Sequence, residues 1–111
     1  MMDRKRFLAL LEENKGVIVV KYGATWCKPC KQIQPYLDEK KRTLGDDTLY
    51  IELDVDDDFD LYAHLKTKKQ VVGVPVLLAY KKGNVTPYAD KCVSGTNRAD
   101  LDNFFDCLDL L

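Results

Sequence analysis

Two cysteines separated by two residues, Cys27 and Cys30 in "GATWCKPCKQIQP", are the side chains with the most obvious chemistry in this sequence. Three residues are close to one helical turn, and a disulfide needs Cα atoms roughly 4.4 to 6.8 Å apart. A helix N-terminus would stabilise a thiolate there, because it carries partial positive charge and free backbone N–H groups. The spacing is therefore compatible with a working redox pair, with half of a metal site, or with two ordinary small residues near a helix start.

A strand followed by a helix is expected to position these cysteines. The run "VIVVKY", residues 17–22, is β-branched and bounded by glycines, as is typical of a strand buried on both faces. A helix is predicted from near Cys27 to Leu44, with Pro35 kinking it. Cys27 is then exposed at the helix start and expected to attack, while Cys30 lies one turn inside and resolves.

The rest of the chain predicts an α/β fold. Helices are expected over 3–14, 27–44, 57–69 and from 97 to 108, and strands over 17–22, 48–54, 74–83 and 87–93. Two strands joined by a helix form a right-handed crossover, so 17–22 and 48–54 should lie parallel, with the last two strands forming a hairpin. We expect a mixed central sheet of about four strands, flanked by helices, in the spatial order 48–54, 17–22, 74–80, 87–93.

Helical periodicity and end signals predict parts of the core and the helix caps. Thr96 or Asn97 can cap the last helix, and the acidic run "DVDDDFD", residues 54–60, is interpreted as a helix N-terminus with favourable dipole charges. The residues expected to face the core from the first and last helices are Phe7, Leu8, Leu10, Leu11, Leu101, Phe104, Phe105 and Leu108.

Composition limits the classes of protein to consider. With 111 residues, 46% of them hydrophobic and 32% charged, the chain can bury one modest core, so residues 1–111 are expected to form a single domain. The 17 Lys and Arg nearly balance the 18 Asp and Glu, which disfavours nucleic acid and anionic membranes as partners. The sequence shows no targeting segment, and the expected location is the cytoplasm.

A metal site is the alternative that the four cysteines keep open. Cys92 and Cys107 are not paired at ligand spacing and His64 is isolated, so a zinc site built with Cys27 and Cys30 is disfavoured. Cys92 and Cys107 are interpreted as small buried or half-buried hydrophobic residues. We therefore expect thiol chemistry without a metal.

The sequence resembles the thioredoxin family from Phe7 to Leu108. The segments that carry the resemblance are "ATWCKPC", the helix proline Pro35, "ELDVDD", "GVPV", "YKKG" and "VSGTNRADL". A lone CxxC motif would be a weak signal. A CxxC between a strand and a helix, followed by a Val-Pro that enters a later strand, is a strong one. The resemblance implies the thioredoxin fold.

The resemblance also implies a role for each residue that matches the family's motifs. Cys27 would be the nucleophile and Cys30 the resolving thiol, while Trp26 shields the site and Pro29 restricts the backbone between the thiols. In the second half of the chain, Pro75 matches the family's cis-proline, the Val74 backbone would pair with the substrate chain, and Gly95 would let the substrate approach.

Several departures from the family pattern concern the site and its surroundings. The family's opening strand has no counterpart, and a few extra residues precede Gly73 and lie in the hairpin "NVTPYADK". Lys28 replaces a glycine between the cysteines, and Lys21 stands where the family buries an aspartate. Glu52 stands where a lysine is common on the neighbouring strand, so we expect Lys21 and Glu52 to form an ion pair with exchanged charges.

The expected function is that of a thiol-disulfide oxidoreductase. It would reduce protein disulfides through a reversible Cys27–Cys30 dithiol, without a prosthetic group, and take electrons from a separate reductase or from glutathione. The alternatives are a disulfide oxidase or isomerase, or a non-catalytic binding module. The expected partners are disulfide-bearing proteins and a reductase. A monomer is expected, and the alternative is a weak dimer through the edge strand 48–54.

Overall fold

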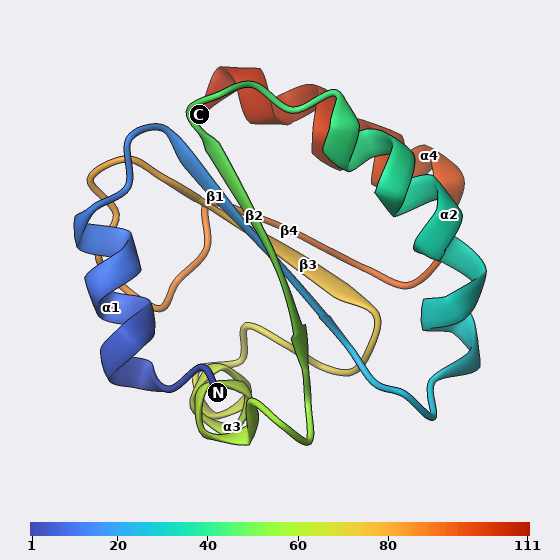
Figure 1. Ribbon diagram of the computed structural model, residues 1–111, viewed down its shortest axis with the longest axis horizontal. Coiled ribbons are helices and arrows are strands. Elements are labelled where there is room, and N and C mark those ends of the chain that lie inside the picture. Colours follow the sequence, from blue (N-terminus) through green and yellow to red (C-terminus); the bar gives the residue numbers. More distant parts are fainter.

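The computed structural model of the protein describes all of residues 1–111, and its elements alternate between helices and strands. In chain order they are α1 (Arg4–Glu12), β1 (Val17–Gly23), α2 (Lys28–Arg42), β2 (Thr48–Asp54), α3 (Phe59–Thr67), β3 (Val76–Lys81), β4 (Lys91–Ser94), α4 (Arg98–Asp106) and the 3₁₀ helix η1 (Cys107–Leu110). Figure 1 shows the sheet nearly edge-on, with α1 and α3 on one side and α2 and α4 on the other. The fold is therefore a three-layer α/β arrangement, as predicted.

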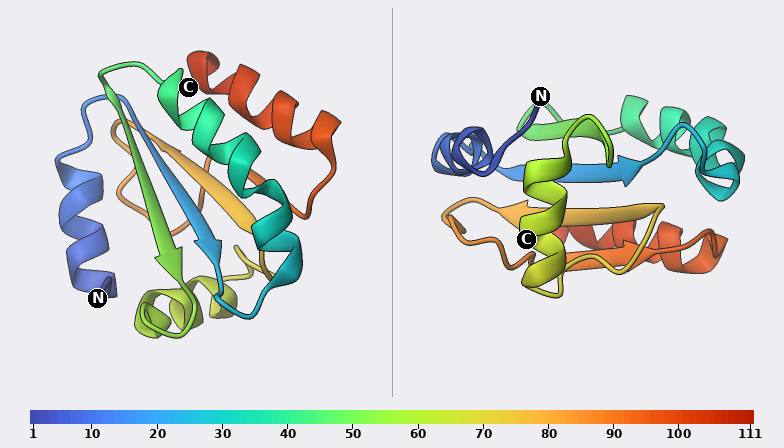
Figure 2. Two further views of the ribbon diagram at one scale, coloured as in Figure 1. Left: turned by 45° about the vertical axis from the view of Figure 1, so that its right-hand side comes forward. Right: turned by 90° about the horizontal axis from the view of Figure 1, so that it is seen from below.

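The sheet has four strands in the order β2-β1-β3-β4, which is the predicted order. Strand β1 pairs in parallel with β2, from Val17 opposite Thr48 to Gly23 opposite Asp54, and antiparallel with β3. No strand precedes α1, so β2 forms one edge of the sheet, as Figure 2 also shows. No helix is both long and apolar enough to span a membrane.

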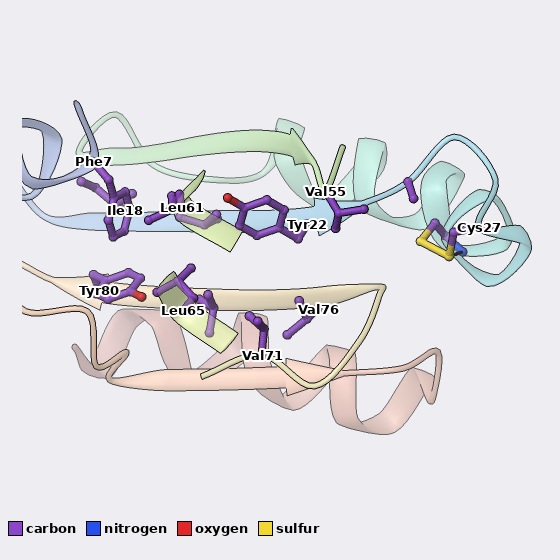
Figure 3. Close-up of a cluster of buried hydrophobic side chains, with 14 of the residues drawn as sticks. Phe7, Ile18, Tyr22, Cys27, Val55, Leu61, Leu65, Val71, Val76 and Tyr80 are labelled. Atoms are coloured by element: carbon purple, nitrogen blue, oxygen red, sulfur yellow. Dashed lines mark hydrogen bonds between the residues drawn. A yellow bond between two sulfur atoms is a disulfide. The ribbon is translucent and has the colours of Figure 1, made fainter. Parts of the chain in front are cut away.

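Alternation along β1 and β3 gives the sheet two hydrophobic faces, which explains why these strands read as continuous apolar runs. One face packs Ile18, Val20 and Tyr22 against α1 and α3, and Figure 3 shows part of this cluster. The other face packs Val17 and Val19 against α2 and α4. Both central strands are thus covered by helices on both faces.

The helix starts follow their capping residues. Asp3 accepts a hydrogen bond from Arg6 N–H at the start of α1, and Asn97 accepts one from Asp100 N–H at the start of α4. The prediction that Thr96 or Asn97 caps the last helix is thus confirmed, with Asn97 as the cap. The four residues expected to face the core from the last helix are buried, namely Leu101, Phe104, Phe105 and Leu108.

Some predicted boundaries and faces are wrong. Strand β4 begins at Lys91 and not at Pro87, because Asn84 organises the preceding turn by accepting from Thr86 N–H. Leu8, expected in the core, is 43% exposed. The last helix also divides at Cys107, where α4 gives way to η1.

Candidate active site

Cys27 and Cys30 are joined by a disulfide, with their Cα atoms 5.3 Å apart. They lie where β1 has ended and α2 begins, and Figure 3 shows the disulfide at one end of the cluster on the α1 and α3 side. Cys27 is the N-cap of α2, and its Sγ accepts the N–H of Cys30 at 3.2 Å. The sulfur of Cys27 therefore lies at the positive end of the helix dipole, where a thiolate is stabilised.

The two sulfurs differ in what they face and not in how exposed they are. The expectation that Cys27 is the exposed member is wrong for this disulfide form, since Cys27 is 4% exposed and Cys30 is 3% exposed. Cys27 Sγ lies 3.8 Å from the carbonyl oxygen of Val74. Cys30 Sγ lies instead beside Gly23 and Lys21, on the inner side of the site.

The proline loop lies against Cys27. The Val74–Pro75 peptide is cis, as predicted. Gly95 donates its N–H to the carbonyl oxygen of Pro75 at 3.0 Å, and its φ of +91° is in the region that glycine adopts without strain. The structure thus brings Val74 against Cys27, with Pro75 next to it and Gly95 hydrogen-bonded to Pro75, although these residues are distant from Cys27 in sequence.

Trp26 and the first turn of α2 form the outer surface of the site. The Trp26 side chain is 66% exposed, and its indole Nε1–H donates to Asp56 Oδ2 at 3.0 Å. Lys28 and Pro29 are exposed as well. The indole is therefore fixed at its polar edge while much of its apolar surface stays accessible to another molecule.

Lys21 and Glu52 form the ion pair that the sequence predicts. They lie opposite each other in the parallel register of β1 and β2, with Lys21 Nζ 3.7 Å from Glu52 Oε2. The Lys21 side chain is only 8% exposed, whereas that of Glu52 is 31% exposed. Gln34 completes the group, since it accepts from Lys21 Nζ at 3.2 Å and donates to Glu52 Oε2 at 3.1 Å.

Sequence reasoning did not identify Gln34 as part of the site. Gln34 follows Cys30 by four residues, and residues at that spacing share one face of a helix. That spacing could have identified Gln34, because a polar side chain on the same face of α2 as Cys30 can reach the same strand, β1. The residues that line a hollow of about 410 Å³ beside Cys30 include Lys21, Gly23, Gln34, Glu52 and Asp54.

The remaining cysteines and the histidine lie apart from this site. Cys92 and Cys107 are free thiols, on β4 and at the start of η1. Although Cys92 is exposed as a residue, its sulfur lies 3.7 Å from the Gln70 carbonyl oxygen, and burial raises the pKa of this thiol. No group of three or more His, Cys, Asp or Glu side chains is arranged to hold a metal ion.

The fold and the site together define a class of protein. A disulfide that caps a helix at the end of a central strand, with a proline loop against its first sulfur, is arranged for thiol-disulfide exchange. The sequence model of the thioredoxin family matches residues 1–106. The chain therefore belongs to the thioredoxin family and is a thiol-disulfide oxidoreductase.

Individual relatives agree with this assignment. The chain is 35% identical to thioredoxin of Bacillus subtilis over 74 residues, which cover 67% of each chain. It is 35% identical to chicken thioredoxin over 89 residues, which cover 80% of this chain and 76% of the chicken protein. A solved structure of Plasmodium falciparum thioredoxin shares the fold with a TM-score of 0.73, at 24% identity over 96% of this chain and 94% of that one.

Proposed function

We propose that Cys27 is the nucleophile and Cys30 the resolving thiol in the reduction of protein disulfides. The position of Cys27 Sγ carries this assignment. The sulfur accepts the Cys30 N–H at the start of α2 and lies against the Val74 carbonyl, so its thiolate form is stabilised beside a backbone that can hold a substrate chain.

The proposed reaction balances two electrons and two protons. Cys27 thiolate attacks one sulfur of the substrate disulfide, forming a mixed disulfide and releasing the other substrate sulfur as a thiolate that takes up a proton. Cys30 then loses its proton and attacks Cys27 Sγ. The bond from Cys27 to the substrate breaks, the second substrate thiolate is protonated, and the Cys27–Cys30 disulfide remains.

The residues around the two cysteines are proposed to support this reaction. Trp26, with its indole fixed by Asp56, would cover one side of the bound substrate. The Val74 backbone would pair with the substrate chain next to Pro75. Gly95 lacks a side chain and has no other atom within 4 Å of the place where a Cβ would lie, so the chain of a substrate can approach there.

The electrons for the next cycle are proposed to come from a separate reductase or from glutathione. No prosthetic group is required, because the Cys27–Cys30 pair itself stores the two electrons. The cytoplasm is the proposed compartment. The free thiols of Cys92 and Cys107 support it, because a reducing compartment keeps such thiols reduced.

Reduction of insulin by dithiothreitol tests the proposed activity. We expect the protein to shorten the delay before reduced insulin chains precipitate, and we expect Cys27→Ser to abolish this effect. An inactive wild-type protein that still binds disulfide-bearing proteins would favour a non-catalytic binding module. A protein that instead oxidises reduced, unfolded substrates faster than it reduces insulin would favour an oxidase or isomerase.

We propose that the protein acts as a monomer. Val17 N–H donates to Asp47 O and Val55 N–H donates to Gly23 O, so the alternating backbone groups of Tyr50 and Glu52 point away from β1. These groups leave β2 with an open edge that another chain could pair with. We nevertheless expect a mass in solution of 12.7 kDa, that of a monomer, at micromolar concentration in sedimentation experiments. A dimer that Tyr50→Pro abolishes would contradict the monomer and place self-association on the edge strand 48–54.

A further inference from the structure

A buried lysine lies near the resolving cysteine. A Cβ placed on Gly23 would lie 2.7 Å from Lys21 Nζ and 3.5 Å from Cys30 Sγ, so the amine and the sulfur flank the same point. Both residues line the hollow of about 410 Å³ beside the site. The absence of a side chain at Gly23 is what lets the amine reach this position.

The Lys21 amine has two polar partners, the side chains of Gln34 and Glu52. Gln34 Oε1 accepts from Nζ at 3.2 Å, and the Glu52 carboxylate lies at 3.7 Å. Glu52 is itself shared, because Lys41 Nζ lies 3.9 Å from its other oxygen and Gln34 donates to it. The Glu52 carboxylate is thus divided among three donors, and part of the Lys21 charge is left to act on the neighbouring sulfur.

Other charged groups lie at or near the same hollow, and their charges also act on Cys30. Lys31 contributes positive charge from α2. Asp38 does not line the hollow but is linked to it, because it accepts from Gln34 Nε2 at 2.8 Å. The acidic side chains that line the hollow from the end of β2 and the following turn are Asp54, Asp57 and Asp58. The Lys21 ammonium group and Cys30 Sγ both lie within 3.5 Å of the position that a Gly23 Cβ would occupy.

We propose that Lys21 is a positioning residue for the redox step, whose ammonium group stabilises the Cys30 thiolate and so favours the dithiol form of the protein. This inference rests on the proposed function of the cysteine pair. When Cys30 gives up its proton to solvent in the hollow, the negative charge forms beside the ammonium group. Because the thiolate belongs to the reduced protein, stabilising it makes the protein a weaker reductant than it would be without Lys21.

Direct titration of Cys30 tests this proposal without requiring turnover. The background is Cys27→Ser, Cys92→Ser and Cys107→Ser, in which Cys30 is the remaining thiol and thiolate absorbance reports its ionisation. Lys21→Met should lower the thiolate fraction of Cys30 at neutral pH about tenfold, whereas Glu52→Gln should raise it by freeing the ammonium group. Opposite responses of these two variants are not expected from a general loss of packing.

Two further variants separate the charge of Lys21 from other effects. Lys41→Met removes the second cation from Glu52, which leaves more of the carboxylate charge to Lys21. It should therefore lower the thiolate fraction of Cys30, but only by about twofold, far less than Lys21→Met does. Gly23→Ala keeps every charge but places a methyl group 2.7 Å from the Lys21 Nζ position, so it should shift Cys30 in the same direction as Lys21→Met. Circular dichroism should show that all variants remain folded.

The intact cysteine pair gives the second readout. Equilibration with glutathione, at a pH where Cys30 is largely ionised in both proteins, should show the Lys21→Met protein to be the stronger reductant. The expected difference there is about tenfold in the equilibrium constant, or about 30 mV. An unchanged Cys30 titration in a folded Lys21→Met protein, or a shift of the same sign in Glu52→Gln, would overturn the proposal. A Cys30 titration that responds as expected in a protein without reductase activity would uphold the role of Lys21 and reject the proposed function.

Discussion

Replacing Cys30 with serine should turn the protein into a trap that holds its substrate as a mixed disulfide on Cys27. Serine cannot supply a resolving thiolate, so the bond between Cys27 Sγ and the substrate sulfur persists until an external thiol cleaves it. Turnover with dithiothreitol should fall roughly a thousandfold, which corresponds to about 4 kcal/mol in the activation barrier. Non-reducing electrophoresis and mass spectrometry of the adduct measure the trapping.

The matched control for this experiment is Cys27→Ser. It retains Cys30, which faces Lys21 and Gly23 on the inner side of the site, so it should trap no substrate. Both variants are made with Cys92 and Cys107 replaced by serine, because their free thiols could form adducts of their own. Equal trapping by the two variants would show that the roles of nucleophile and resolving thiol are wrongly assigned.

Much of the fold could be predicted because the buried strands carry an unambiguous pattern. The run from Val17 to Tyr22 must be covered on both sides, which requires helices on both faces of the sheet. The helix between this strand and 48–54 then requires a right-handed crossover, and the parallel register of β1 and β2 follows. The exchanged pair of Lys21 and Glu52 is predicted from the family pattern, and the observed register places the two residues opposite each other.

The errors in the prediction arise where single side chains decide local structure. Leu8 fits the helical period of α1, but the buried stripe of this helix is narrow and consists of Phe7 and Leu11, with Leu10 partly buried against the same cluster. The segment 87–90 has the composition of a strand, yet it is held in a turn, because Asn84 donates to the carbonyl oxygen of Tyr88. Hydrophobic periodicity predicts neither the exposure of Leu8 nor the turn at 87–90.

Some residues of the candidate site could be predicted from the sequence, and others could not. Cys27, Cys30, Pro75 and Gly95 belong to recognisable motifs, so their positions could be anticipated. The burial of Cys27 could not, because it depends on how closely the loop at Val74 packs against the sulfur. Residues that support the site through hydrogen bonds, such as Gln34, have no motif of their own.

Asp58 has a role beyond the one interpreted from the sequence. The acidic run does lie at a helix start, with Asp58 as the N-cap of α3 and Asp60 in its first turn, but the Asp58 side chain makes no capping hydrogen bond. Its carboxylate is buried and accepts from Met2 N–H at 2.6 Å and from Asp54 N–H at 3.0 Å. Asp58 therefore joins the N-terminal segment to the end of β2.

The same residue also anchors the core beneath the site. Its carbonyl oxygen accepts from the hydroxyl group of Tyr22 at 3.2 Å. Burial and the neighbouring Asp58 carboxylate raise the pKa of Tyr22, so this hydroxyl group remains a donor throughout the physiological range. The turn that Asp58 holds also carries Asp56, which fixes the Trp26 indole.

Replacing Asp58 with alanine should lower the free energy of unfolding by roughly 2–4 kcal/mol, because two N–H groups lose a charged acceptor and a buried N–H without a partner is costly. Asp58→Asn should cost about half as much, since one acceptor oxygen remains. Asp57→Ala is the matched control, because Asp57 is exposed and its side chain accepts no hydrogen bond within the protein. Urea unfolding followed by circular dichroism gives the free energies, and fluorescence of Trp26, the single tryptophan, reports whether the turn has moved. If Asp57→Ala and Asp58→Ala destabilise the protein equally, the effect belongs to the overall acidic charge of the turn and not to the two hydrogen bonds that Asp58 accepts.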